Sequence, residues 1–430
     1  MTEPFRVALA GLGTVGTSVF RLIETHAELY AARIGRPLEV VAVSARDRDK
    51  QRGIDCTRCV WFDDPVAMAA EAEADCVVEL IGGEEGAALE LTQVALEQGR
   101  HVVTANKALL AHHGSALAKQ AETANRALRF EAAVAGGIPI INALQDGLTA
   151  NRIERVYGIL NGTANYILTE MERTGRAFED VLKEAQELGY AEADPSFDIG
   201  GIDAGHKLSL LAALAFGMRV RFDALPMTGI TAIEADDIAY ARDLGYRIKL
   251  LGIAQHTEEG IAQRVEPCLV GAAHPLSPVD GVFNAVVIDA DAVDRLTFVG
   301  RGAGGEPTAS AVLADLIDVA RGQVRPAFIT PAEKLSDLPL AAVDALPGPF
   351  YLRLKVVDRP GVIAAIADRL ARETISIESM MQRARAEGDV VPVVIVTHET
   401  TRAAMERALA DIATLDVVSG APCLLSIENF

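Results

Sequence analysis

The glycine-rich stretch GLGTVG, residues 11–16, constrains the fold of this chain more than any other feature. It follows a short apolar run, FRVALA at residues 5–10, and precedes TSVFRLIETHAELY, whose apolar residues recur at helical spacing. Gly11, Gly13 and Gly16 permit a tight turn, close approach of a ligand to the backbone and close packing of helix on strand. Strand, glycine turn and helix in this order predict a dinucleotide phosphate site at a helix N-terminus.

Three further apolar runs extend the pattern. They are LEVVAV at residues 38–43, CVVELI at 76–81 and HVVTA at 101–105, and the helical segment EEGAALELTQVALEQG separates the last two. Continuous apolar strands that alternate with helices are typical of a parallel sheet covered on both faces. We therefore expect an α/β, Rossmann-type domain over residues 1–135.

The end of the second run bears on the choice of dinucleotide. An acidic residue there binds the ribose hydroxyls of NAD, whereas an arginine accommodates the additional phosphate of NADP. The sequence reads VAVSARDRDK, in which Arg46 comes first and Asp47, Arg48 and Lys50 follow. Arg46 favours NADP, and Asp47 leaves NAD open. A solvated charged loop would explain Arg48 and Lys50 equally well.

After residue 135 the regular alternation stops. Residues 136–325 mix helices with longer β-type runs such as YRIKLLGIAQH, which predicts a second, mixed α/β domain. A helix with Thr308 as its N-cap and Gly322 just past its end is expected near 308–324, where it is a candidate to pack back on the first domain.

The C-terminal part shows a different order of elements. A proline-rich stretch without periodicity, residues 326–348, predicts a linker. Residues 349–430 then read as strand, helix, two strands, helix and strand, with ISIESMMQRA at 375–384 as the second strand. The order βαββαβ predicts a ferredoxin-like domain.

One helix in the middle of the chain carries charges at its start. The segment GGIDAGHKLSLLAALAFG is apolar enough for a buried helix, yet Asp203 and Lys207 lie four residues apart near its beginning. The spacing alone favours a simple intrahelical ion pair. Partial burial would instead lower the pKa of the lysine toward a range useful for proton transfer. Lys107 follows the HVVTA strand at its carboxyl end, where parallel sheets bind ligands.

Charge and cysteine content exclude some classes of partner and site. A net charge of −20 argues against nucleic acid and against anionic membranes as partners. Apolar runs are too short to span a bilayer, and the N-terminus does not resemble a signal peptide. Five scattered cysteines indicate a reducing, cytoplasmic setting. Cys56 and Cys59 form a CxxC pair without a second ligand pair, which predicts two unlinked thiols.

Several long motifs occur together in one known family. VVELIGG, HVVTANKALLA, EAAVAGGIPII, GILNGTANYILT, LGYAEADPSFDIGGIDAGHKLSLLA and GRGAGGEPTASAVLADL resemble, in this order, the motifs of homoserine dehydrogenases. The resemblance covers about residues 5–325 and implies that residues 136–325 form the catalytic and dimerisation domain. DRPGV at residues 358–362 resembles the start of an ACT domain, an amino-acid-binding regulatory module. The resemblance implies NAD(P)-dependent interconversion of L-homoserine and L-aspartate 4-semialdehyde, as part of threonine and methionine biosynthesis.

The resemblance also implies roles for individual residues. It makes Lys207 the general acid/base, supported by Asp203 and by Lys107, which lies between cofactor and substrate. Glu192 and Asp198 would bind the substrate, whose ammonium group explains a gathering of carboxylates. The implied cofactor-binding residues are Gly11, Leu12, Gly13, Thr14, Val15, Gly16, Arg46, Lys107 and Gly302.

A cation and an effector are implied on the same basis. In some members, a monovalent cation, Na+, binds the Glu131 side chain and the carbonyls of Val134, Gly136 and Ile138. The ACT-like tail implies feedback control, with threonine as the expected effector, in a homodimer or homotetramer. Dimerisation without an effector remains an alternative for the tail. For the whole chain, the alternatives are a related amino acid or semialdehyde dehydrogenase and a non-enzymatic amino acid sensor.

Overall fold

The computed structural model describes residues 3–382 and 389–430. Its N-terminal part is a six-stranded parallel sheet in the order β3-β2-β1-β4-β5-β6, which confirms the predicted Rossmann-type sheet. The strands are β1 (Phe5–Ala10), β2 (Leu38–Ser44), β3 (Val60–Phe62), β4 (Cys76–Glu79), β5 (His101–Thr104) and β6 (Leu128–Arg129). The helices are α1 (Thr14–Thr25), α2 (Ala27–Ile34), α3 (Pro65–Glu71), α4 (Ala87–Glu97) and α5 (Lys107–Thr123).

Strand β1 is buried because its side chains enter two different cores. Val7 and Leu9 pack in one cluster with residues of α1 and α12 (Gly305–Ala320). Ala8 and Ala10 pack on the other face, in the cluster that contains residues of α3, α4 and α5. A strand covered on both faces has no polar side, and this is why the sequence shows an unbroken apolar run.

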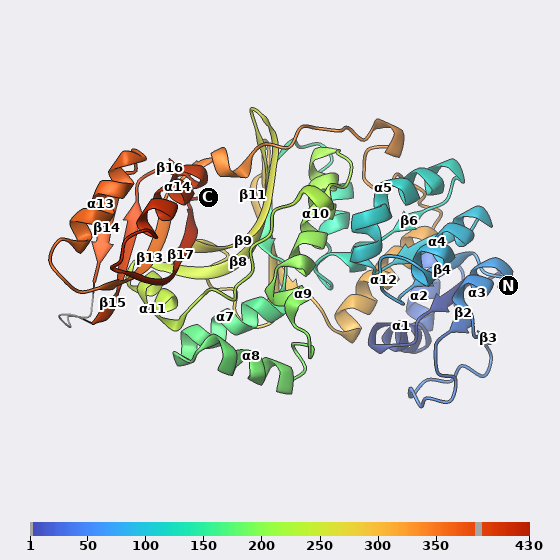
Figure 1. The fold of residues 1–430 in the computed structure, drawn as a ribbon. Coiled ribbons are helices and arrows are strands. Elements are labelled where there is room, and N and C mark those ends of the chain that lie inside the picture. The colour runs from blue at the N-terminus through green and yellow to red at the C-terminus, as the bar shows by residue number, and fades with distance from the viewer. Residues whose placement is uncertain (1–2, 383–388) are drawn as a thin grey trace.

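Helix α12 lies against α1, far from it in sequence (Figure 1). The prediction of Thr308 as its N-cap is wrong. Gly304 is the N-cap, the helix begins at Gly305, and the Thr308 N–H already donates to the Gly304 carbonyl. Pro307 is tolerated in this first turn because a helix start leaves its N–H groups without intrahelical partners. Gly322 lies just past the end, with φ of 83°.

The middle of the chain forms an antiparallel run of strands, β11-β10-β7-β8-β9. These are β7 (Ile153–Ile159), β8 (Tyr246–Thr257), β9 (Gly260–Gly271), β10 (Phe283–Ala290) and β11 (Asp294–Arg301). The remaining helices here are α6 (Ile140–Asn142), α7 (Gly162–Thr174), α8 (Phe178–Glu187), α9 (Ser196–Ile199), α10 (Ile202–Phe216) and α11 (Ala235–Asp243). Helix α10 packs between this sheet and α5, and Gly217 ends it in the left-handed conformation.

The C-terminal part has the predicted ferredoxin-like order, with the sheet β17-β13-β15-β14. Its elements are β13 (Phe350–Val357), α13 (Val362–Arg372), β14 (Ile377–Met381), β15 (Val390–Thr397), α14 (Arg402–Ile412) and β17 (Val418–Glu428). A short pair, β12 (Pro347–Gly348) and β16 (Thr400–Thr401), flanks them. Residues 383–384 of the predicted second strand lie outside the described residues.

The middle and C-terminal sheets are continuous. Strand β17 pairs in parallel with β9, so that Ser426 lies opposite Cys268 and Glu428 opposite Val270. This pairing creates one mixed sheet of nine strands, which bridges the yellow and red parts of Figure 1. The proline-rich stretch 326–348 follows the middle of the chain, where Ser336 and Leu340 make bridges to Met218 and Ile261. Short helical turns occur at η1 (Glu131–Ala133), η2 (Ala143–Gly147), η3 (Phe222–Ala224), η4 (Ala332–Lys334) and η5 (Val343–Ala345).

Among the residues that the structure describes, no helix has both the length and the apolar character needed to cross a bilayer.

Candidate active site

The three glycines of the glycine turn differ in the space around them. Gly11 has φ of 98°, and a Cβ there would lie 2.5 Å from the Leu80 carbonyl oxygen. A Cβ on Gly16 would lie 1.9 Å from the Gly11 carbonyl oxygen, whereas one on Gly13 would meet nothing within 4 Å. Gly11 and Gly16 are therefore required by the fold itself. Gly13 and the neighbouring Thr14 are exposed at the start of α1, where the helix N-terminus is open to an anion.

Residues after β2 surround the same turn. Arg46 is exposed just beyond the end of β2. Asp47 accepts hydrogen bonds from the backbone N–H groups of Asp49 and Lys50, so its carboxylate is used within its own loop. Arg52, which the sequence did not single out, donates from Nε to the Leu12 carbonyl at 3.1 Å. Arg52 lies in a loop with several other basic residues, and no motif around it in the sequence distinguishes it from them.

The charged residues at the start of α10 form one buried group with Lys107. The Lys207 Nζ donates to Asp203 Oδ2 at 2.7 Å and to the Leu160 carbonyl at 2.7 Å. Lys107 is the first residue of α5, and its Nζ lies 3.2 Å from Asp203 Oδ1. Asp203 thus lies between two ammonium groups, one on each carboxylate oxygen. The ion pair expected from spacing is present, and it is buried.

Burial and charge shift the proton affinities of these groups. Burial lowers the pKa of Lys207, and the neighbouring Asp203 carboxylate opposes this shift in part. Burial disfavours the Asp203 carboxylate, but Lys207, Lys107 and the hydrogen-bond donors around it hold its pKa below its usual value. The pKa of Asp198 is raised, mainly because it is partly buried. An ammonium with a lowered pKa is a better proton donor.

A cavity of about 570 Å³ opens at this group. It joins the glycine turn to the charged group, because Val15 of α1 lines the same cavity as Lys107 and Lys207. The predicted site residues that line it are Val15, Lys107, Gly136, Asp198, Asp203, Lys207 and Gly302. Glu192 is exposed and is not among the lining residues, although Gly189 and Tyr190 of the same segment are.

Two asparagines in this cavity were not predicted. The Asn161 Nδ2 donates to Asp198 Oδ1 and to Asp203 Oδ2, both at 2.8 Å. The Asn284 Nδ2 donates to the Leu160 carbonyl, the same oxygen that Lys207 binds. A Cβ on Gly302 would lie 2.1 Å from the Asn284 amide, which explains the glycine there. Asn161 is the first asparagine of the motif GILNGTANYI. Its position before a helix is equally typical of an ordinary N-cap residue.

The predicted cation site lies beside the cavity. Glu131 is buried, and its two carboxylate oxygens accept the backbone N–H groups of Ile141 and Asn142. The Ile138 carbonyl accepts from the Ile140 N–H. Gly136 has φ of 53°. Each of these oxygens keeps a second lone pair, so the set of hard oxygen donors remains chemically suited to a cation such as Na+.

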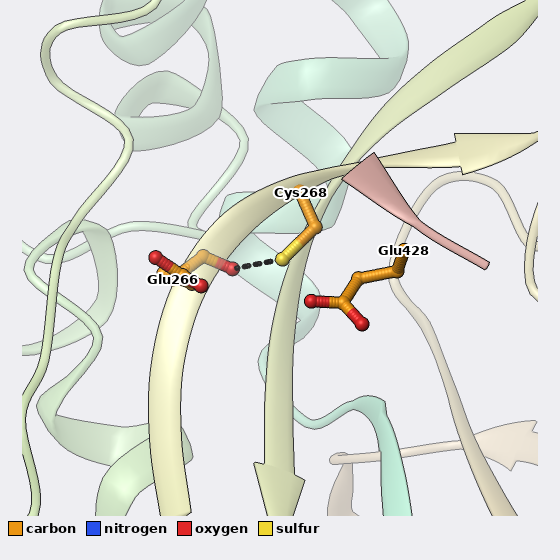
Figure 2. A group of neighbouring side chains, drawn as sticks. All are labelled: Glu266, Cys268 and Glu428. Carbon is orange, nitrogen blue, oxygen red and sulfur yellow. Dashed lines mark hydrogen bonds between the residues drawn. The ribbon is translucent and has the colours of Figure 1, made fainter. Parts of the chain in front are cut away.

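A second group of ligand-type side chains lies where β9 meets β17. Figure 2 shows Glu266, Cys268 and Glu428, with the Cys268 thiol directed at the Glu266 carbonyl at 3.5 Å. The Glu266 carboxylate accepts from Arg264 and Arg402, and the Glu428 carboxylate accepts from Arg264. Burial raises the pKa of the Cys268 thiol well above its usual value. Arginines already neutralise these carboxylates, so the group stabilises the junction between the two strands.

All five cysteines are unpaired, as expected for Cys56 and Cys59. Burial raises the pKa of the Cys59 thiol to about 11, and its Sγ lies 3.2 Å from the Val40 carbonyl. Neither thiol has the depressed pKa that a reactive cysteine requires.

Comparison with known proteins identifies the family of this chain. Residues 11–131 match the model of the homoserine dehydrogenase NAD-binding domain, 139–317 match the homoserine dehydrogenase model, and 350–414 match the ACT domain. The homoserine dehydrogenase of Pseudomonas aeruginosa is 45% identical over 99% of each chain, and that of Neisseria gonorrhoeae is 44% identical over the same shares. The chain belongs to the homoserine dehydrogenase family.

Solved structures of this family agree with the fold. The crystal structure of a homoserine dehydrogenase from Thiobacillus denitrificans has a TM-score of 0.93, with 45% identity over 99% of both chains. A hyperthermophilic archaeal homoserine dehydrogenase, solved in complex with NADPH, has a TM-score of 0.64 and 28% identity. It covers 75% of this chain and 100% of its own. The chain is thus an NAD(P)-dependent oxidoreductase of the homoserine dehydrogenase family with a C-terminal ACT domain.

Proposed function

We propose that this chain interconverts L-homoserine and L-aspartate 4-semialdehyde, with Lys207 as the proton donor and acceptor. One observation carries the proposal: the buried Lys207 ammonium and the open N-terminus of α1 border one continuous cavity. The bound nicotinamide supplies a hydride to the aldehyde carbon, or accepts it in reverse. Lys207 gives its proton to the aldehyde oxygen as that carbon is reduced, and takes it back during oxidation.

The other charged residues have separate roles in this proposal. Asp203 keeps Lys207 and Lys107 oriented and neutralises one of the two positive charges. Lys107, between the glycine turn and Asp203, faces both cofactor and substrate. Asp198 binds the substrate ammonium, whose charge its carboxylate complements. Glu192 is the second proposed substrate ligand; its side chain is exposed on the segment whose Gly189 and Tyr190 line the cavity.

We propose NADP as the preferred cofactor. Arg46 is exposed beyond β2 where the additional phosphate would lie, and the Asp47 carboxylate is occupied by backbone N–H groups of its own loop. The archaeal relative solved with NADPH supports the same choice. The remaining proposed cofactor-binding residues are Gly11, Leu12, Gly13, Thr14, Val15, Gly16, Lys107 and Gly302.

We further propose that an amino acid, threonine, inhibits the enzyme through the ACT domain. The continuous sheet supports this proposal, because β17 of that domain pairs with β9. On the same strand β9, Val265 packs against Gly201, the N-cap of the helix that carries Asp203 and Lys207. A change in the ACT sheet therefore has a short physical connection to the proton donor.

The remaining proposals concern the setting of the enzyme. We propose a homodimer or homotetramer, with Na+ bound as a structural cation by Glu131 and the carbonyls of Val134, Gly136 and Ile138. A cytoplasmic location is supported by the five unpaired thiols.

The first test is a spectrophotometric assay of nicotinamide reduction with L-homoserine, using NAD or NADP, with and without L-threonine. We expect substrate-dependent reduction, faster with NADP, and inhibition by threonine. Lys207→Ala should lower kcat by about 10²–10⁴-fold while cofactor binding is retained. Lys183→Ala, which removes an exposed lysine on α8, is the matched control. Normal turnover by Lys207→Ala would refute the proton-donor role, and no turnover by the wild type would favour a sister dehydrogenase or a sensor.

A further inference from the structure

Asn161 connects two carboxylates that should repel each other. Its Nδ2 carries two hydrogens, and one goes to Asp198 Oδ1 and the other to Asp203 Oδ2. Asn161 and Asp203 are both buried, at 3% and 4% exposure. We propose that Asn161 is a positioning residue, which fixes the Asp203 carboxylate against Lys207 and keeps Asp198 directed at the substrate. This inference rests on the proposed function of Lys207.

The orientation of the Asn161 amide is determined by its other contact. Its Oδ1 accepts the backbone N–H of Ala164 at 2.7 Å and so caps α7. Because the oxygen is held by the helix, the nitrogen must face the two carboxylates. A flipped amide would lose the cap and turn an acceptor toward two anions. The start of α7 therefore fixes the direction of both donated hydrogen bonds.

The Asn161 hydrogen bonds complete the surroundings of Asp203. Asp203 Oδ2 accepts from both Asn161 and Lys207, while Oδ1 faces Lys107. Without Asn161, the carboxylate would be held only by two flexible lysine side chains and would rotate more freely. The Lys207 ammonium would then lose its fixed direction toward the reacting oxygen, although its other partner, the Leu160 carbonyl, would remain.

Substitution of Asn161 by serine or by aspartate distinguishes this positioning role from a role in folding. Both are good N-caps, so α7 should be retained in Asn161→Ser and Asn161→Asp. The serine hydroxyl is too short to donate to both carboxylates. The aspartate would instead add a third negative charge beside Lys207. A purely structural role predicts that both variants behave alike, provided that both are folded.

The experiment measures kcat/KM for semialdehyde reduction against pH, for the wild type and both variants. Asn161→Ser should lower kcat/KM at least about 10-fold and move the acidic limb of the pH profile to higher pH by about 1 unit, because the lost hydrogen bonds had favoured the carboxylate forms. Its basic limb should move to lower pH, since Asp203 no longer holds the ammonium firmly. In Asn161→Asp, the additional charge favours the ammonium, so the basic limb should move to higher pH.

Asp64→Ser is the control, because Asp64 caps α3 on the N-terminal sheet and its replacement also retains a capping side chain. It should leave both limbs in place. Melting temperatures and cofactor affinities verify that all variants are folded. Unshifted limbs in folded Asn161 variants would overturn the inference while leaving Lys207 in its role. Normal turnover by Lys207→Ala would instead refute the proposed function on which the inference rests.

Discussion

Two buried aspartates of this chain show how neighbouring charge determines protonation. Asp203 lies between two ammonium groups, which hold its pKa below the usual value despite burial. Asp315 of α12 is equally buried, and burial raises its pKa to about 7 although Arg129 opposes the shift. Glu131, whose backbone N–H donates to Asp315, has a pKa raised to about 8, again mainly by burial. An aspartate side chain is therefore ionised at position 203, whereas at position 315 it keeps its proton until the pH approaches 7.

Asp315 should make the folded protein less stable as pH rises. Between about pH 4 and pH 7, the folded state retains a proton on Asp315 that the unfolded chain has already lost. Its contribution to stability is thus present below pH 4 and is lost as pH approaches 7. Asp315→Asn should reduce this slope, because the amide cannot ionise but still accepts the Glu131 N–H, and the slope that remains is that of Glu131. Urea unfolding of both proteins between pH 4 and pH 8 measures the difference.

The exposed Asp344→Asn is the control for that experiment and should keep the wild-type slope. If Asp315→Asn has the same pH dependence as the wild type, Asp315 is ionised throughout and the predicted direction is wrong.

At the scale of an element, the glycine turn separates fold from ligand binding. Gly16→Ala should destabilise the protein by about 1–3 kcal/mol, because its Cβ would overlap the Gly11 carbonyl oxygen. Gly13→Ala introduces a Cβ into open space, so the free protein should melt near the wild-type temperature. Its cofactor affinity should nevertheless fall, since the methyl group lies where the phosphates approach. Thermal melts with and without NADP measure both effects.

A Gly13→Ala protein that binds the cofactor normally would place the phosphates away from this turn. A Gly16→Ala protein with unchanged stability would mean that the turn opens without strain.

The elements differ in how well the sequence predicts them. Strand β1 begins and ends where predicted, because burial on both faces leaves an unbroken apolar run. The N-cap of α12 was predicted four residues too late, because the actual cap, Gly304, has no side chain to signal it. The site was predicted in part: Asp203, Lys207 and Lys107 do meet, but Asn161 resembled an ordinary cap. Its second function depends on Asp198 and Asp203, which are distant in sequence.

At the scale of the whole molecule, a buried ion pair joins the ACT sheet to the catalytic part. Arg353 of β13 donates from Nε and Nη2 to the Asp237 carboxylate of α11, at 2.6 Å and 3.0 Å. The Tyr351 hydroxyl donates to the same carboxylate at 2.9 Å. Asp237 and Arg353 are almost completely buried. The two parts are therefore fixed to each other by charge as well as by the shared sheet.

Arg353→Met should destabilise the protein by about 3–5 kcal/mol, because it leaves the Asp237 charge buried with Tyr351 as its remaining donor from β13. The double variant Asp237→Leu/Arg353→Met should recover most of this loss, since no buried charge remains. Chemical unfolding measures both variants. A double variant no more stable than Arg353→Met would show that packing at this position, and not the unpaired charge, accounts for the loss.

The pairing of β17 with β9 also affects how the protein is made. The last strand of the chain completes the edge of a strand, β9, that the ribosome synthesised more than a hundred residues earlier. Until β17 has been synthesised, residues 268–270 of β9 have unpaired N–H and C=O groups where another chain could add. Synthesis of this chain therefore leaves its middle sheet unfinished until β17 emerges, and a product that stops before β17 retains an edge that can pair with other chains.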